Sequence, residues 1–311
     1  MSKIINTYKK SLLVRYDKDP AIPYFSESYF PGLKKEEFTF ENRKGINVKY
    51  FYYYYDNFQK DKVILFCHGI GPGHTAYLRE IEYLAKNGYK VLTLDYSGCG
   101  ESGGETMSSF YEPTRDVCDL IKHLNLKEEI MMVGHSLGAF TALNIINLFT
   151  QINVGVIMSG FISIYHLMKG LFKFSFIAKK IDKYEREAGD IVAKLDNLQF
   201  LKGTKKKILF IHSKDDNVVN YKTNTYLLEK LNNSSLSFLI VDNHLHNPNY
   251  RLDSVKYMNS VIGKYYKLVK SKKLVTLEEK KDYFKDVDLY QLTEQDDKVW
   301  DVILSHLTHK N

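Results

Sequence analysis

The chain has 311 residues, of which 44% are hydrophobic and 14% are aromatic. That apolar fraction is too high for a disordered chain, and the length is ample for a large buried core. Its 44 Lys and Arg against 37 Asp and Glu give a net charge of +7. The positive charge is mild and forms no basic block, so the sequence predicts no nucleic-acid partner.

The cysteines and the hydropathy of the chain indicate the compartment in which the protein is expected to work. Cys67, Cys99 and Cys118 are too scattered for a disulfide framework or a zinc site, which favours a reducing compartment. Residues 1–15 lack the apolar stretch of a signal peptide, and no run approaches the roughly 20 apolar residues that span a bilayer. We therefore expect a cytoplasmic protein without stable membrane insertion. The sequence predicts no oligomeric state.

The chain begins with a predicted hairpin and continues as an alternation of strands and helices. Strands at 36–41 and 46–55 flank a turn that contains Gly45. Further strands are expected at 63–67, 89–95, 130–133, 154–159, 207–212 and 237–241, and helices at 75–87, 111–124, 137–149, 222–231 and 252–268. This alternation predicts an α/β fold with a mostly parallel sheet, helices on both faces and an N-terminal antiparallel hairpin. Functional groups in such sheets gather where the strands end.

The strand at 130–133 runs into Gly134-His135-Ser136-Leu137-Gly138, and a helix follows. This is G-x-S-x-G at a strand–turn–helix junction, where the serine sits on a sharp turn and the flanking glycines allow strand and helix to approach closely. The motif predicts Ser136 as a nucleophile. The alternative is a buried serine that only caps the helix.

With this motif the chain resembles the α/β-hydrolase family, and the resemblance extends over residues 36–268. The strand at 63–67 ends in His68-Gly69-Ile70-Gly71-Pro72-Gly73, which is similar to the family's H-G-x loop. The resemblance implies that the backbone amides of Ile70 and Leu137 form an oxyanion hole. His68 is expected to be structural.

The segment 95–102 resembles the family's D-x-R-G-x-G-x-S pattern, with Ser97 in place of the arginine. It also contains Gly98, Gly100 and Gly103 at the spacing of a dinucleotide-binding loop. These glycines start three residues after Asp95, and no clear helix begins at Gly103. Both features disfavour a nucleotide site.

The serine needs a base, and the base needs an orienting acid. The loop that starts at His212 resembles the family's H-G-x-x-D-x-x-V, which assigns the acid to Asp216 and leaves Asp215 as the alternative. After the last strand the family carries its catalytic histidine, and the spacing favours His246 over His244. The pair could also bind a metal, but no carboxylate or cysteine at ligand spacing supports this, so we expect neither a metal nor a cofactor.

Residues 161–205 are predicted to form a small helical cap inserted into a hydrolase domain of residues 1–268. Four apolar residues at helical spacing are the candidate substrate-binding side chains: Leu167, Met168, Leu171 and Phe172. Two alternatives remain. The helix could pack only on its own core, or its interspersed lysines, among them Lys173, could bring it to an anionic membrane surface.

A C-terminal helical extension is predicted for residues 269–311. Thr276-x-x-Glu279 and Thr293-x-x-Asp296 resemble helix-start capping boxes, and an apolar stripe follows between residues 299 and 307. We expect these helices to pack back on the core, and the alternative is a dimer contact.

Together these features predict a serine hydrolase that acts on a small-molecule acyl substrate. The motifs resemble most the monoacylglycerol-lipase and serine-aminopeptidase branch of the family. The expected reaction is cleavage of carboxylic esters with short-to-medium acyl chains through an acyl-enzyme on Ser136. An acyltransferase, a thioesterase or a peptidase on the same triad, and a non-catalytic binding protein, remain alternatives because the fold hosts all of them.

Overall fold

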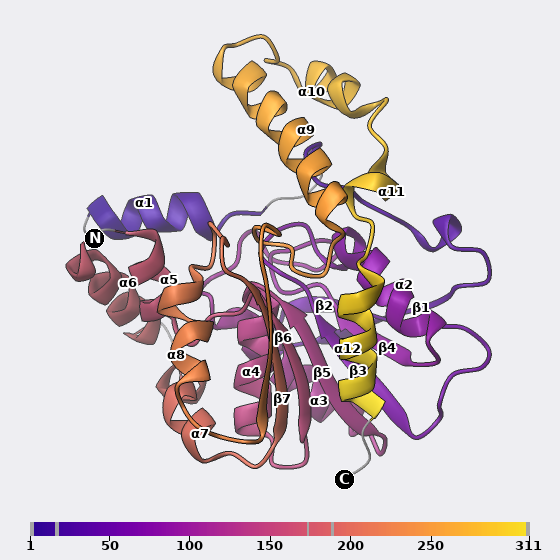
Figure 1. Cartoon of the computed structure of the whole chain (residues 1–311), viewed down its shortest axis with the longest axis vertical. Helices are drawn as coiled ribbons and strands as arrows, with labels where there is room; N and C mark the ends of the chain where they lie inside the picture. Colours follow the sequence, from indigo (N-terminus) through magenta and orange to yellow (C-terminus); the bar gives the residue numbers. More distant parts are fainter. Residues whose placement is uncertain (1–2, 16–18, 173, 188–189, 309–311) are drawn as a thin grey trace.

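The computed structural model describes residues 3–15, 19–172, 174–187 and 190–308, and Lys173 lies outside them. At its centre is an eight-stranded sheet with the order β1-β2-β4-β3-β5-β6-β7-β8 (Figure 1). The strands are β1 Lys34–Glu41, β2 Asn47–Tyr54, β3 Lys62–Cys67, β4 Lys90–Leu94, β5 Glu129–His135, β6 Val154–Met158, β7 Lys207–Ser213 and β8 Leu236–Val241. β2 pairs antiparallel with β1 and β4, and the strands from β3 to β8 run parallel. The predicted fold class is confirmed.

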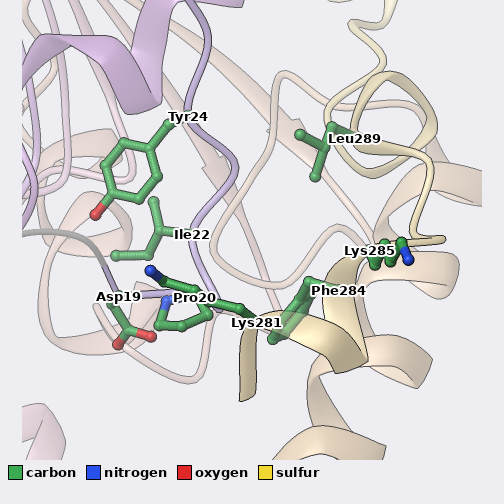
Figure 2. A pocket seen from close by; sticks show the side chains of 8 residues that line it. All are labelled: Asp19, Pro20, Ile22, Tyr24, Lys281, Phe284, Lys285 and Leu289. Atoms are coloured by element: carbon green, nitrogen blue, oxygen red, sulfur yellow. The ribbon is translucent and has the colours of Figure 1, made fainter. Parts of the chain in front are cut away.

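The C-terminal segment has two parts that behave differently. α9 (Leu252–Lys270) and α10 (Leu277–Phe284) project away from the sheet in Figure 1 and contact each other through the rings of Tyr265 and Phe284, 4.9 Å apart. The predicted capping box of Thr276 and Glu279 starts α10. A groove of about 430 Å³ lies between residues 19–24, α10 and α11 (Leu289–Leu292), and Figure 2 shows its lining.

α12 (Asp297–Thr308) returns to the sheet. Its apolar stripe is buried, with Trp300 fully enclosed, so the expectation that this part packs on the core is confirmed. The second predicted capping box does not form, because Thr293 ends α11 and its hydroxyl donates back to the Leu289 carbonyl. α9 differs from the expectation that it covers the sheet, since none of its described residues belongs to the buried apolar clusters of the core.

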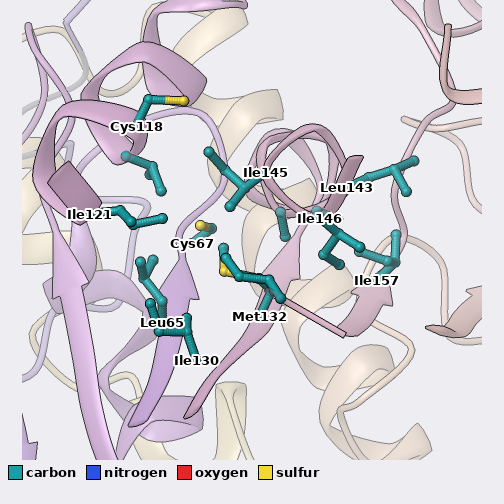
Figure 3. Close-up of a cluster of buried hydrophobic side chains, with 14 of the residues drawn as sticks. Leu65, Cys67, Cys118, Ile121, Ile130, Met132, Leu143, Ile145, Ile146 and Ile157 are labelled. Atoms are coloured by element: carbon teal, nitrogen blue, oxygen red, sulfur yellow. The ribbon is translucent and has the colours of Figure 1, made fainter. Parts of the chain in front are cut away.

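Two apolar clusters cover the two faces of the sheet. Alternate β3 residues divide between them, because neighbouring side chains in a strand point to opposite faces: Leu65 and Cys67 join one cluster, and Ile64 and Phe66 join the other. The first cluster, shown in part in Figure 3, packs under α3 (Glu112–Leu124), α4 (Leu137–Leu148), α7 (Asn197–Gly203) and α8 (Thr225–Glu229). The second packs under α2 (Leu78–Lys86) and α12.

The predicted cap contains α5 (Ile164–Leu171), α6 (Ser175–Glu187) and α7, which lie in the sequence between β6 and β7. The structure also contains a helix that was not predicted from the sequence, α1 (Lys3–Leu12). It packs beside α6 (Figure 1). The Tyr8 hydroxyl donates to Glu185 at 2.5 Å, inside a third cluster of buried apolar residues that joins α1 and the cap to the start of α4. Burial raises the pKa of Glu185 to about 7.

Candidate active site

Ser136 lies on a strained turn between β5 and α4, with φ 56° and ψ −119°. A Cβ at Gly138 would lie 1.9 Å from the Cys67 carbonyl oxygen, and one at Gly134 would lie 2.4 Å from the Gly138 carbonyl oxygen. Both glycines of the motif are therefore required by close backbone approach. The Ser136 amide donates to the Met158 carbonyl at 2.9 Å, which fixes the turn against β6. This geometry leaves the serine 7% exposed.

The two amides predicted for the oxyanion hole belong to segments that touch. The approach of Gly138 to the carbonyls of Cys67 and His68 brings the start of α4 against the loop that contains Ile70. Within the described part of the chain, neither the Ile70 nor the Leu137 amide has a hydrogen-bond acceptor. Both can donate to a substrate oxygen, and their role stays a prediction.

Asp216 and His246 are hydrogen-bonded to each other. His246 Nδ1 lies 3.0 Å from Asp216 Oδ1 and 2.9 Å from Oδ2. The amides of Val218 and Val219 donate to Asp216 Oδ1 at 2.9 and 2.8 Å, so backbone groups fix the carboxylate. Burial alone would raise the pKa of Asp216, but hydrogen bonds from His212 and His246 outweigh it and hold the pKa well below the usual range. An ionised Asp216 orients His246 with the proton on Nδ1 and the lone pair on Nε2.

The two alternative residues have other partners. Asp215 is exposed and accepts a hydrogen bond from the Ser213 hydroxyl. His244 turns back on its own segment, with Nδ1 2.7 Å from the Asp242 carbonyl. Neither belongs to the Asp216–His246 pair.

His135 connects the serine turn to the histidine loop, and the sequence did not indicate this role. Its Nε2 lies 2.7 Å from the His246 carbonyl, and its Nδ1 lies 3.1 Å from the Tyr77 hydroxyl. Burial, reinforced by the nearby His246, lowers the pKa of His135 to about 3, so the ring is neutral. His135 therefore donates from Nε2 to the carbonyl and accepts from Tyr77 at Nδ1. The motif gave its position, but its partners lie 58 and 111 residues away.

A second buried network holds the far end of the histidine loop. Asn249 Nδ2 donates to Glu80 Oε1 at 3.2 Å and to Gln295 Oε1 at 2.9 Å. Trp300 Nε1 donates to the same Gln295 oxygen at 2.8 Å. Burial raises the pKa of Glu80 to about 7. The loop that carries His246 is thus tied to α2 and α12.

Asp95 packs against Gly100, one of the glycines in the pattern after β4, and against Gly73, which follows β3. This buried carboxylate accepts from the amides of His74 and Glu101 at 2.7 and 2.8 Å. A Cβ at Gly73 would lie 2.4 Å, and one at Gly100 2.2 Å, from its oxygens. Close approach to Asp95 accounts for Gly100, and a Cβ at Gly98, which has φ 79°, would lie 2.3 Å from the Thr106 carbonyl carbon, so packing explains both glycines without a nucleotide.

The structure does not gather the four predicted cap residues in one place. Leu167 and Met168 are buried in the third cluster, which also contains Leu137 next to the serine. Leu171 and Phe172 are 43% and 38% exposed. Only the first two lie in an apolar cluster that reaches the serine turn.

The described residues contain no group of three or more His, Cys, Asp or Glu side chains that could hold a metal ion. None of the helices in that part of the chain is both long enough and apolar enough to cross a bilayer.

Comparisons with known proteins agree with this architecture. A serine aminopeptidase family model matches residues 59–184. An epoxide hydrolase of Caballeronia sordidicola is 32% identical over 83 residues, which are 26% of this chain and 25% of that protein. The uncharacterized protein YqkD of Bacillus subtilis is 24% identical over 259 residues, covering 75% of this chain and 79% of its own length. The matches to the first curated relatives span about a quarter of those proteins' lengths.

Solved structures show the same fold over most of the chain. An esterase of Pyrococcus furiosus superposes with a TM-score of 0.59 at 20% identity, covering 83% of this chain and 96% of the esterase. An acylaminoacyl peptidase of Pyrococcus horikoshii gives a TM-score of 0.55 at 17% identity, covering 77% of this chain and 42% of the peptidase. With the sheet order and the strained serine turn between β5 and α4, these matches show that the chain has the α/β-hydrolase fold.

Proposed function

We propose that the protein is a serine hydrolase that cleaves carboxylic esters through an acyl-enzyme on Ser136. The observation that carries the proposal is the hydrogen bond between His246 and Asp216. His135, the neighbour of Ser136, binds the backbone carbonyl of the same His246. A serine on a strained turn, and an imidazole that a carboxylate orients in the loop bound by the serine's neighbour, are the groups that a hydroxyl nucleophile needs for activation. The similarity to an esterase agrees with this chemistry.

In the proposed reaction the Ser136 oxygen attacks the carbonyl carbon, and His246 Nε2 takes the hydroxyl proton. The resulting oxyanion accepts hydrogen bonds from the amides of Ile70 and Leu137. His246 then protonates the leaving alcohol as the ester C–O bond breaks, and the acyl group remains on the serine. Water then attacks the acyl carbon while His246 takes its proton, and His246 returns that proton to the Ser136 oxygen as the bond between serine and acyl group breaks and the acid leaves. Asp216 holds the imidazole throughout and stabilises its cation.

The proposed substrates are esters of short-to-medium acyl chains. The third cluster supports this preference, because it contains the buried cap residues Leu167 and Met168 together with Leu137, which follows Ser136. Each buried methylene contributes about 0.8 kcal/mol, or about fourfold in binding. The ratio kcat/KM should therefore rise from acetyl to longer p-nitrophenyl esters and fall once the enclosed space is filled. Faster cleavage of aminoacyl amides than of any ester would favour the peptidase alternative.

A fluorophosphonate probe tests the nucleophile directly. The wild-type chain should be labelled on a single residue, and Ser136→Ala should abolish both labelling and ester hydrolysis. Ser159→Ala is a matched control, because Ser159 also follows a central strand, has φ 46° and is buried. It should be labelled like the wild type. Labelling that survives in Ser136→Ala would overturn the assignment.

A further inference from the structure

The junction of α5 and α6 exposes an unusual concentration of apolar side chains. We call four of them the cap tip: Leu171, Phe172, Phe174 and Phe176. Phe174 is 63% exposed and Phe176 is 59% exposed, with their ring centroids 5.9 Å apart. Scattered exposed apolar residues need no explanation, but a contiguous group indicates a surface that meets another apolar phase.

An apolar groove continues from the cap tip along α1. It has a volume of about 490 Å³, and Phe172 and Ile177 form one wall while Ile4 and Leu12 of α1 form the other. The cap tip and the groove therefore form one apolar face, built jointly by α1 and the cap.

Positive charge surrounds this face. α1, α5 and α6 carry eight Lys and Arg residues against three acidic ones, whereas the whole chain has 44 against 37. The acidic residues are largely neutralised. Glu185 is buried under Tyr8 with its pKa raised to about 7, Asp182 pairs with Arg186 at 2.9 Å, and Glu187 lies 3.6 Å from Lys183.

The remaining lysines on these helices are exposed: Lys3, Lys9, Lys10, Lys169, Lys179 and Lys180. Over the described residues, no carboxylate lies within ion-pair distance of Lys179 or Lys180, which follow the exposed phenylalanines on α6. A partner with an apolar interior and negatively charged groups at its surface would contact both the phenylalanines and these lysines favourably.

We propose that this face docks the protein peripherally on an anionic lipid bilayer. Phenylalanines at the cap tip enter the boundary between headgroups and acyl chains, and the lysines contact the lipid phosphates. The charge of the surrounding helices argues for an anionic bilayer rather than a neutral one. Docking of this kind is reversible and needs no spanning helix. The proposal does not depend on the catalytic assignment, because binding is measured without a substrate.

The test is flotation of the full chain with two kinds of vesicle, phosphatidylcholine alone and phosphatidylcholine mixed with phosphatidylglycerol. The wild type should bind the anionic vesicles far better, and added salt should weaken the binding. The double variant Phe174→Ser with Phe176→Ser should lose more than about tenfold in partitioning, since burial of one phenylalanine is worth that much. Lys179→Glu with Lys180→Glu should lose about fivefold for each unit of charge removed.

Matched controls lie where α9 leads into α10, outside the cap tip and its groove. Val275→Ser with Leu277→Ser removes two apolar side chains that are 64% and 54% exposed, and should leave vesicle binding unchanged. Circular dichroism and thermal midpoints check that every variant folds. Equal binding to both vesicle types, no binding, or equal losses in the control variants would overturn the proposal. So would a phenylalanine variant that changes only the oligomeric state in light scattering, because the cap tip would then contact a second copy of the chain.

Discussion

Asp216→Asn isolates the electrostatic part of the proposed triad from its geometry. Asparagine has nearly the same shape, and its oxygen can still accept from the amides of Val218 and Val219, which lie 2.9 and 2.8 Å from Asp216 Oδ1. Its amide nitrogen then faces His246 Nδ1 and donates to it. The imidazole must therefore carry its proton on Nε2, so it has no lone pair there to accept the proton of Ser136.

The expected loss in kcat is about 10⁴-fold, since the wrong tautomer removes general-base catalysis and also the stabilisation of the imidazolium. This corresponds to about 5 kcal/mol in the activation free energy. The folded protein should also be less stable near neutral pH. A carboxyl whose pKa is lowered by folding stabilises the native state above its ordinary pKa, and that contribution is lost as the pH falls toward the lower folded value.

The assay is the initial rate of p-nitrophenyl butyrate hydrolysis, together with the rate of fluorophosphonate labelling. Asp215→Asn is the matched control, because Asp215 is the adjacent residue, is exposed and does not contact His246. It should keep its rate within about twofold. If Asp215→Asn loses as much activity as Asp216→Asn, or if Asp216→Asn keeps a tenth of the wild-type rate, the assignment of the acid is wrong.

Two further predictions concern the groups that hold the histidine loop. His135→Leu should lower kcat by about 10²-fold with little change in KM, because misplacing a general base is that costly, and Tyr77→Phe should have a smaller effect. Equal activity of the wild type and both variants in a p-nitrophenyl butyrate assay would refute the positioning role. Folding raises the pKa of Glu80 to about 7 from the ordinary value of 4.5, so the native state keeps a proton that the unfolded chain releases, and stability should fall as the pH rises between these values. In Glu80→Gln, the fall in the free energy of unfolding over this pH range, measured by urea unfolding, should be smaller by up to about 3 kcal/mol. An unchanged pH dependence in this variant would contradict the raised pKa of Glu80.

The loops that carry the candidate site could be predicted because the chain orders them. Parallel strands all end at the same edge, so Ser136, Asp216 and His246, each placed just after a predicted strand, were expected to converge. The structure pairs the last two directly. The glycines around the serine were also readable, since their close approach to Cys67 and Gly138 carbonyl groups leaves no room for a side chain.

Helix partners could not be predicted, because an amphipathic pattern shows that a helix has an apolar face but not what covers it. The helix at 252–268 had the pattern expected of a sheet-covering element, yet α9 packs with α10, and α12 covers the sheet instead. α1 is short and rich in lysine, and its contacts with α6, such as the Tyr8–Glu185 hydrogen bond, come from a segment far along the chain. Short helices depend on tertiary packing of this kind rather than on intrinsic propensity.

The C-terminal segment helps to hold the candidate site, which its sequence did not suggest. Residues 249–251 pair with 294–296 through backbone hydrogen bonds, from the Arg251 amide to the Glu294 carbonyl and from the Asp296 amide to the Asn249 carbonyl. The loop that carries His246 is therefore held at His246 by His135 and at its end by the strand-like segment that leads into α12. Because the orientation of a general base must be accurate to a fraction of an ångström, we expect residues 294–296 to support the proposed chemistry by fixing the end of this loop.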